Sequence, residues 1–557
     1  MFHGNFNNTG TIIKFIFRRE RFISTMWIAI LVLFTVGVAP AMAEMFPDAT
    51  SRNAFAASVN NPVMVAMMGP VYGSDNYTSG AMYSGMMLLW YAMAVAIMNI
   101  FFVVRHTRAD EQAGRVEVVR SLPTGRLANL NATMISAFIL NFILGLLTGL
   151  GLAMLGLDGM DFAGSMAYGF ATMGIGLVFA SIAALFSQLS SNASGATGLS
   201  FMSMGAFYAI RAAGDMQGIE IISCISPLGL VLRTQAYMEN NIWPPLVMIL
   251  TAFVLSAAAY KLNSIRDLGQ GFIAAKPGRA TASSSLLSPF GLAWRLLRTP
   301  LIVWAIVMFS LGASYASVIG NIDALIGDST EYMQVIGVPV DQLAAMSQAD
   351  QAKLIVNSFG IFVTLMMTLV CIVPLLNAVL KVRSEEQEGR AENILTRAVP
   401  RCKYLAGYVI LAYITSVAIQ FLTAIGLYGT AAYMAGADNP FTFNEMMASY
   451  FAFLPALWIM IAFTVLIIGL LPKLTGVVWG YFGLVVFLSF IGRMIIPENM
   501  SWIMNITPFQ HVSQPVPSTD SFSNFTIDFT PLIIMTGIAA VLTIAGFISF
   551  RKRDMVW

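Results

Sequence analysis

The chain has 557 residues, of which 57% are hydrophobic and only 10% are charged, and its formal net charge is +2. Soluble domains of this total length cannot enclose so large an apolar fraction, so the composition excludes a water-soluble multidomain protein. Apolar runs long enough to cross a hydrocarbon layer of about 30 Å recur from end to end and leave no stretch that could form a soluble enzyme domain. The sequence therefore predicts an all-α polytopic membrane protein.

The apolar runs predict about 12 transmembrane helices, six in each half of the chain. In chain order they cover residues 22–43, 81–104, 130–156, 163–187, 196–212, 243–263, 300–320, 354–381, 404–436, 446–471, 474–493 and 530–550. Gly, Ser, Pro and charged residues separate the halves, which predicts a first six-span half over 1–263, a linker over 264–289 and a second six-span half over 290–557. Gly, Ser and charged residues also crowd the outer end of the fifth span in each half.

Basic residues indicate the orientation. Most of the 30 Lys and Arg residues precede the first span or fall in loops on the same side as the N-terminus. Because such loops are normally cytoplasmic, both termini and the linker are predicted to be cytoplasmic. Residues 12–21 and 290–298 mix aromatic side chains with Arg ahead of the first span of each half, and we interpret them as interfacial elbow helices. The alternative is that they serve only as topological anchors.

Two charged segments repeat at a spacing of 275 residues, each in the inner loop after the second span of its half. RADEQAGRVEVVRSLPTGR at 108–126, the first charged segment, aligns without a gap with RSEEQEGRAENILTRAVPR at 383–401, the second charged segment. The coincident residues are Arg108/Arg383, Glu111/Glu386, Gln112/Gln387, Gly114/Gly389, Arg115/Arg390, Glu117/Glu392 and Arg126/Arg401. Each half also closes with an Arg-Asp pair, at 266–267 and 553–554. Since each copy has an even number of spans, the halves are predicted to be parallel pseudo-repeats.

Each charged segment is predicted to form a short amphipathic helix. Glu111 and Arg115 stand four residues apart with the acid first, as do Glu386 and Arg390, which is the favourable order for an ion pair. A helix that is charged at one end and apolar along one edge suits docking into a groove on a soluble partner.

The alternative is that both segments are solvated inner loops, rich in Arg because topology requires it. That interpretation explains the arginines but not the recurrence of Glu, Gln and Gly at matching positions. Gly114 and Gly389 would each cost a continuous helix about 1 kcal/mol.

Acidic residues and histidines limit the possible mechanisms. All 28 Asp and Glu residues fall in predicted loops or at span ends, which disfavours a proton-coupled carrier but leaves open a sodium site built from carbonyls and hydroxyls. The sequence contains no G-x-x-x-x-G-K-[ST] phosphate loop. His3, His106 and His511 do not cluster, and His106 is interpreted as an interfacial residue. We therefore expect no enzyme activity, catalytic residue, metal or cofactor in this chain.

Several strings resemble the bacterial ABC exporter permeases of the polyketide-antibiotic exporter or tetronasin-resistance type. They are NPVMVAMMGPVYG (61–73), VVRHTRADEQAGRVEVV (103–119), SPLGLVLRTQAY (226–237), RDLGQG (266–271) and VRSEEQEGRAEN (382–393). The resemblance runs nearly the full length, and the R-x-[DE]-E-x-x-G-R-x-E pattern, present twice, is its most specific element. One departure is that residues 507–510 read Thr-Pro-Phe-Gln where the first half has Ser-Pro-Leu-Gly at 226–229, so equivalence of the halves in gating stays open.

The resemblance implies a coupling helix after the second span of each half, through which two ATP-binding subunits carrying ATP and Mg²⁺ drive the permease. The residues that it assigns to this partner contact are Arg108, Glu111, Gly114, Arg115, Glu117, Arg383, Glu386, Gly389, Arg390 and Glu392. The implied function is export of a hydrophobic or amphiphilic compound, such as an antibiotic, a drug or a lipid-like molecule, across the bacterial inner membrane, without nucleic acid. The substrate-binding residues are not indicated. An ion-coupled secondary transporter of amphiphilic substrates is the alternative.

Overall fold

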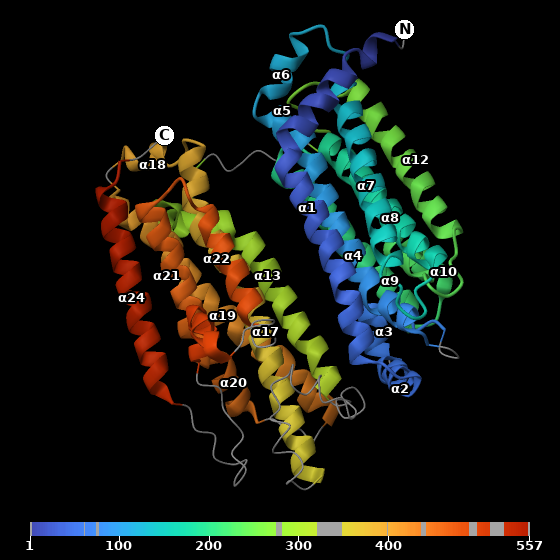
Figure 1. The fold of residues 1–557 in the computed structure, drawn as a ribbon. Helices are drawn as coiled ribbons and strands as arrows, with labels where there is room; N and C mark the ends of the chain where they lie inside the picture. The colour runs from blue at the N-terminus through green and yellow to red at the C-terminus, as the bar shows by residue number, and fades with distance from the viewer. Residues whose placement is uncertain are drawn as a thin grey trace. The chain divides into compact units, whose positions relative to one another are not determined.

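The computed structural model describes residues 3–60, 62–73, 77–273, 281–319, 348–397, 399–435, 442–489, 498–512 and 528–554. All regular elements within these residues are helices, which confirms the predicted all-α class. Part of the predicted linker and the end of the span predicted over 474–493 lie outside the described residues. The chain divides into two compact units, Met1–Gly278 and Arg279–Trp557, and each is described by itself (Figure 1).

Unit 1 is a bundle arranged around one central helix, α8. Its long helices are α1 (Thr9–Met45), α4 (Ser79–Val104), α7 (Ala128–Ala153), α8 (Phe162–Leu189), α9 (Ala193–Met216) and α12 (Trp243–Ile265). Its short ones are η1 (His3–Phe6), α2 (Ala49–Val59), α3 (Pro62–Met68), η3 (Arg105–Ala109), α5 (Asp110–Gln112), α6 (Arg115–Arg120), α10 (Glu220–Ile225) and α11 (Pro227–Leu232). Helix α8 packs against α4, α7, α9 and α12, and α1 packs on α7 and α4. The first charged segment, with α5 and α6, lies at the opposite end of the bundle from α2 and α3 (Figure 1).

Unit 2 is a second bundle with its own apolar core. Its long helices are α13 (Pro289–Ile319), α17 (Gln348–Gln387), α19 (Arg401–Ala435), α21 (Leu454–Leu470) and α24 (Phe529–Lys552). Shorter ones are η4 (Ser284–Leu287), α18 (Glu392–Leu395), α20 (Phe443–Ala452), α22 (Gly476–Phe487), η7 (Glu498–Ile506) and η8 (Pro508–His511). Helix α13 packs on α19, and α24 packs on α21. The second charged segment, with α18, lies at the same end of this unit as the last residues of α24 (Figure 1).

Ten helices of the described chain are long and apolar enough to cross a membrane, five in each unit. The two missing from the predicted set of 12 are the fifth span of each half. Helix α9 is continuous over 24 residues, but Gly, Ser, Arg211 and Asp215 lower its hydropathy. Helix α22 is apolar over its 12 residues, and because the end of the span predicted over 474–493 lies outside the described residues, that span stays a prediction.

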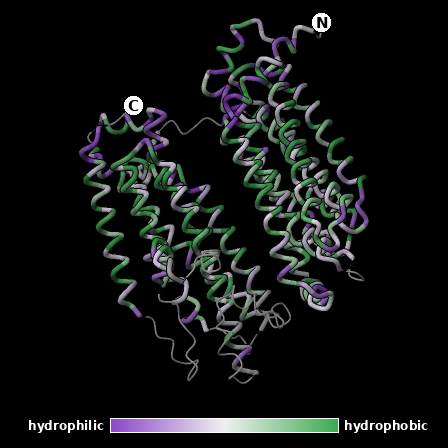
Figure 2. The backbone as a smooth tube through the Cα atoms, viewed as in Figure 1, coloured by the Kyte–Doolittle hydropathy of each residue, from purple (hydrophilic) through white to green (hydrophobic). Residues whose placement is uncertain are grey.

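The outer faces of both bundles are apolar. Phe34 on α1, Phe253 on α12 and Val541 on α24 are among many large apolar side chains that are exposed, whereas Thr133, Asn141 and Thr172 are buried inside unit 1. Figure 2 shows hydrophobic residues along the helices and hydrophilic ones concentrated near the helix ends. Such an arrangement is stable only if the outer face contacts lipid, so the chain is a multi-pass membrane protein.

A pair of buried amides joins α4 to α7. Nδ2 of Asn99 donates to Oδ1 of Asn141 at 2.9 Å, and Nδ2 of Asn141 donates back to Oδ1 of Asn99 at 2.7 Å. Each amide also donates to a main-chain carbonyl of its own helix, at Val95 and Ala137. Gly176 of α8 faces the pair, and a Cβ there would lie 1.9 Å from Oδ1 of Asn141. The three helices are therefore fixed together by hydrogen bonds and by one close backbone approach.

The predicted elbow helices are not separate elements. Residues 12–21 form the first turns of α1, and residues 290–298 form the first turns of α13, so the prediction of distinct elbow helices is wrong. The physical reason is clear in α1, because residues 12–27 contain no Gly or Pro that would end a helix.

Candidate functional site

The first charged segment is divided into short helical pieces. A π-helical turn (η3) follows α4, and α5 continues from it to Gln112. At Gly114 the backbone has φ = 72°, and α6 then begins at Arg115. The predicted single amphipathic helix is therefore wrong in unit 1. π-Helical turns inside membrane helices are often found at functional sites.

The second charged segment contains the same turn. Helix α17 ends at Gln387, Gly389 has φ = 68°, and α18 begins at Glu392. A Cβ at Gly114 or Gly389 would meet no atom within 4 Å, so space does not require glycine there. The left-handed backbone conformation does favour glycine, because residues with a Cβ adopt it only at a cost of about 1–2 kcal/mol.

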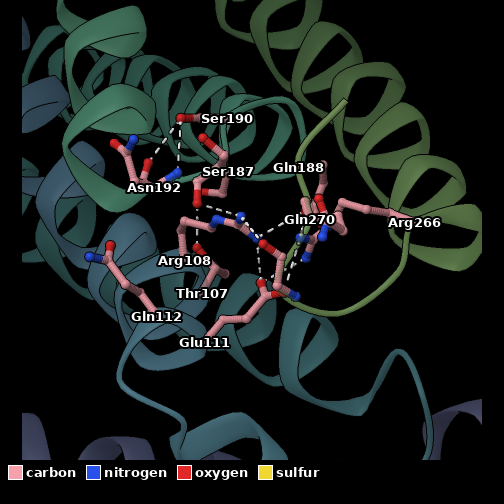
Figure 3. Close-up of polar contacts among 12 residues, drawn as sticks. Thr107, Arg108, Glu111, Gln112, Ser187, Gln188, Ser190, Asn192, Arg266 and Gln270 are labelled. Atoms are coloured by element: carbon pink, nitrogen blue, oxygen red, sulfur yellow. Dashed lines mark hydrogen bonds and ion pairs between the residues drawn. The ribbon is translucent and has the colours of Figure 1, made fainter. Parts of the chain in front are cut away.

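Glu111 lies at the centre of a buried group of charges in unit 1. Arg266, just after α12, donates to both carboxylate oxygens of Glu111, at 3.0 and 2.7 Å. The amide of Gly269 donates to Oε1 at 2.7 Å, and Nη1 of Arg108 lies 3.0 Å from Oε2. Figure 3 shows both guanidinium groups converging on this carboxylate. We call Arg108, Glu111 and Arg266 the Glu111 cluster.

Main-chain carbonyls complete the cluster. Arg108 is 1% exposed, and its Nη2 donates to the carbonyls of Ser191 and Gly269 at 2.6 and 3.1 Å. The carbonyl of Arg266 in turn accepts a 2.9 Å hydrogen bond from Arg126. The first charged segment is thus joined to the start of α9 and to the chain after α12.

Unit 2 contains the corresponding cluster. Glu386 is 2% exposed; its Oε2 lies 3.1 Å from Nη1 of Arg383 and its Oε1 lies 2.5 Å from Nη2 of Arg553. Arg401 donates to the carbonyl of Arg553 at 2.8 Å, as Arg126 does to that of Arg266. We call Arg383, Glu386 and Arg553 the Glu386 cluster.

The ion pairs predicted within each charged segment are wrong. Arg115 contacts Asp110, with Nε 2.8 Å from Oδ1, and does not pair with Glu111. Arg390 likewise contacts Glu385, with Nε 2.7 Å from Oε2, and this hydrogen bond raises the pKa of Arg390. The four-residue rule presumes a continuous helix, whereas the turn at each glycine directs the arginine back to the preceding acid.

The remaining predicted site residues, Glu117 and Glu392, are exposed in the first turns of α6 and α18. Beside Glu117, Val118 and Leu122 are 68% and 59% exposed. In unit 2 Asn393 and Arg397 stand at the matching positions, and the apolar residues Ile394 and Leu395 are half-buried against the core of the unit. The first charged segment therefore offers the larger apolar surface.

His106 belongs to a second buried group found in unit 1. It is 1% exposed; its Nε2 lies 3.2 Å from Oε1 of Glu20 on α1, and its Nδ1 lies 3.8 Å from Oδ2 of Asp110. Arg105 contacts the same Glu20 carboxylate at 3.0 Å, and Arg19 contacts Asp110 at 2.7 Å. His106 is therefore not a simple interfacial residue but connects α1 to the first charged segment.

The turn formed by Ser-Pro-Leu-Gly in unit 1 and by Thr-Pro-Phe-Gln in unit 2 has the same geometry in both units. Oγ of Ser226 accepts from the amide of Leu228 at 3.2 Å, and Oγ1 of Thr507 accepts from the amide of Phe509 at 3.3 Å. Both capping residues have φ = −86° and ψ = 129°. The substitution therefore leaves the local backbone unchanged.

Arg266 and Arg553 are the residues that sequence reasoning did not assign to a site. Each closes its half of the chain as the first residue of an Arg-Asp pair, and this recurrence was the available signal. Within the described residues, no group of three or more His, Cys, Asp or Glu side chains could hold a metal ion.

Comparison with known proteins identifies the family. The family model for the multidrug efflux system permease Rv1217c, C-terminal domain, matches residues 13–261 and 286–551. The multidrug efflux system permease protein Rv1217c of Mycobacterium tuberculosis (strain ATCC 25618 / H37Rv) is 33% identical over 558 residues, which cover 99% of this chain and 96% of that protein. Together with the ten apolar helices, these matches establish that the chain belongs to the Rv1217c family of multidrug efflux permeases.

Proposed function

We propose that the chain is the membrane-spanning subunit of an ATP-driven ABC exporter of the polyketide-antibiotic or tetronasin-resistance type. In this proposal two separately encoded subunits, which bind ATP and Mg²⁺, dock on the two charged segments. The observation that carries it is the recurrence of one buried cluster in both units, each beside an exposed acidic residue, Glu117 or Glu392. Two similar docking sites suit two similar partner subunits.

The buried and exposed residues have different roles in this proposal. Glu117, Glu392, Val118 and Leu122 would contact the partner, because they are accessible. The two buried clusters would hold the charged segments in position. The protein would lie in the bacterial inner membrane with both termini cytoplasmic, and its cargo would be a hydrophobic or amphiphilic compound, consistent with the names of its relatives.

The first test is copurification of the tagged protein from its native membrane, followed by an assay of ATP hydrolysis. A stoichiometric ATPase that copurifies would support the proposal, and a protein that purifies alone would count against it. Replacing Val118 and Leu122 together by Asp should weaken partner binding about tenfold or more, because docking would then bury two unpaired carboxylates. Met154→Asp is the matched control, because Met154 is 85% exposed at the far end of α7.

One observation favours a second candidate, a proton-coupled transporter. His106 lies between the carboxylates of Glu20 and Asp110, and buried groups of this kind bind and release protons in ion-coupled carriers. Inside-out vesicles that contain the permease and its copurified partners distinguish the two. Cargo uptake driven by ATP and unaffected by a protonophore supports the exporter, whereas uptake driven by an imposed pH gradient without ATP supports the carrier.

A further inference from the structure

The last helix of each unit is attached at its end to the charged segment of the same unit. In unit 1 the Arg266 side chain binds Glu111, and its carbonyl accepts from Arg126. In unit 2 the Arg553 side chain binds Glu386, and its carbonyl accepts from Arg401. One arginine in each unit is therefore held both by its side chain and by its main chain.

Both attachments are buried and charge-assisted, and the one in unit 1 is also fixed by parallel hydrogen bonds. Both oxygens of Glu111 accept from Arg266, and Oε1 also accepts from the amide of Gly269. Nε of Arg266 donates to Oε1 of Gln188 on α8 at 3.1 Å, which fixes the plane of the guanidinium. Parallel hydrogen bonds of this kind resist rotation as well as separation.

Each last helix is attached along one side only. Helix α12 packs on α8 and is hydrogen-bonded to it through Ser256 and Asn263, and helix α24 packs on α21; many apolar residues on the other side of each helix are exposed. A peripheral helix held along one side can tilt, and the ionic attachment at its end joins that motion to the element that carries the carboxylate. In both units that element is the charged segment.

We propose that Arg266 and Arg553 are positioning residues through which each charged segment moves the last helix of its unit during transport. The inference rests on the proposed function only in treating the charged segment as the place where the driving force enters. Beyond the proposed function, the inference names the two residues that transmit the motion and states that it passes from the charged segment to α12 or α24.

The test is a double-mutant cycle in each unit, with efflux of ethidium from cells as the readout. Arg266→Gln and Arg553→Gln should each lower the efflux rate about tenfold, in line with the effect of mutations that carry coupling between distant sites. The pairs E111Q/R266Q and E386Q/R553Q should be no worse than the poorer single variant, because each pair removes one interaction. Lys261→Gln on α12 and Lys552→Gln on α24 are matched controls, since both lysines are exposed near the same helix ends, and they should retain efflux within about twofold.

A distance measurement separates positioning from simple loss of folding. Spin labels at the exposed Ala113, between α5 and α6, and at Val254 on α12, in a background without the three native cysteines, should keep one separation through the transport cycle if the two elements move together. In Arg266→Gln the separation should change when transport is started. If that variant does not reach the membrane, Arg266→Lys takes its place, because lysine keeps the charge but cannot form the parallel pair.

Normal efflux in both arginine variants, additive losses in the double variants, or unchanged label separations in Arg266→Gln would overturn the inference. The outcomes stay distinct from those of the proposed function. If efflux does not depend on ATP but the losses in the double variants are non-additive, the positioning role stands and the ABC assignment is wrong. ATP-dependent efflux that is indifferent to Arg266 and Arg553 would do the reverse.

Discussion

The Glu111 and Glu386 clusters are alike at their centres and different at their edges. Each contains one buried carboxylate, an arginine three residues earlier and an arginine that follows the last helix. Unit 1 adds the Glu20 and His106 contacts to α1, whereas in unit 2 Lys381, 275 residues after His106, pairs with Glu385 at 2.9 Å. The shared centre is what both units require, and the additional connection to α1 is particular to unit 1.

The largest effect should come from reversing the central charge. Glu111→Lys would place a third cation between Arg108 and Arg266, and Glu386→Lys would do the same in unit 2. Leaving buried charges unpaired should cost about 3–5 kcal/mol in either unit. Thermal unfolding in detergent measures this loss, with Glu117→Lys as the exposed control. A substantial loss in one unit alone would show that the clusters are not equivalent.

A smaller effect should distinguish the units. Glu20→Gln removes the partner of Arg105 and His106 and should cost about 2 kcal/mol, because hydrogen bonds to charged groups are lost. Leu297, in the apolar core of unit 2, stands at the matching position at a spacing of 277 residues, so unit 2 has no carboxylate in this place. Hydrogen exchange in the first turns of α1 reports the change. Unchanged protection in Glu20→Gln would remove the special role of unit 1.

The glycine turns should respond equally in both units. Gly114→Ala and Gly389→Ala should each cost about 1 kcal/mol, because a side chain disfavours the left-handed backbone. Gly198→Ala in α9 is the control, since the Cβ meets no atom there and the helical backbone suits alanine. Unfolding in denaturant should show the control to be neutral or stabilised. A loss at only one of the two turns would contradict their equivalence.

The smallest effect should come from the pair particular to unit 2. Lys381 is partly exposed, so Lys381→Gln should lower stability by only about 0.5 kcal/mol. Its counterpart His106→Gln, which is buried, should cost more. Thermal unfolding of the two variants side by side gives the comparison. Equal losses would mean that burial does not separate the two sites.

Local composition predicted the helices well, since apolar runs report directly on lipid contact. The fifth span of each half is not confirmed. Polar residues lower the hydropathy of α9, and the apolar run that contains α22 continues beyond the described residues. The internal repeat likewise located the charged segments, because identical residues at a constant spacing can be recognised without knowing which residues contact each other.

The partners within the charged segments were not predictable in the same way. Short-range rules paired Glu111 with Arg115, but the backbone at Gly114 redirects the chain, and no rule of spacing anticipates that. The true partner, Arg266, lies 155 residues away and depends on how α12 packs on α8. Tertiary packing decides such contacts. The recurrence of the Arg-Asp pair therefore indicated that the arginine matters but could not predict which residue it contacts.

The paired amides of Asn99 and Asn141 have a consequence for the kinds of motion open to unit 1. Advancing α4 by one residue against α7 would turn its contact face by about 100° and separate four hydrogen-bonding groups at once, inside the bundle where water cannot replace their partners. Sliding and twisting between these helices are thereby excluded, while tilting of the pair as one body is not. Transport by this unit should accordingly proceed through hinge-like steps of whole helices rather than through screw-like ones.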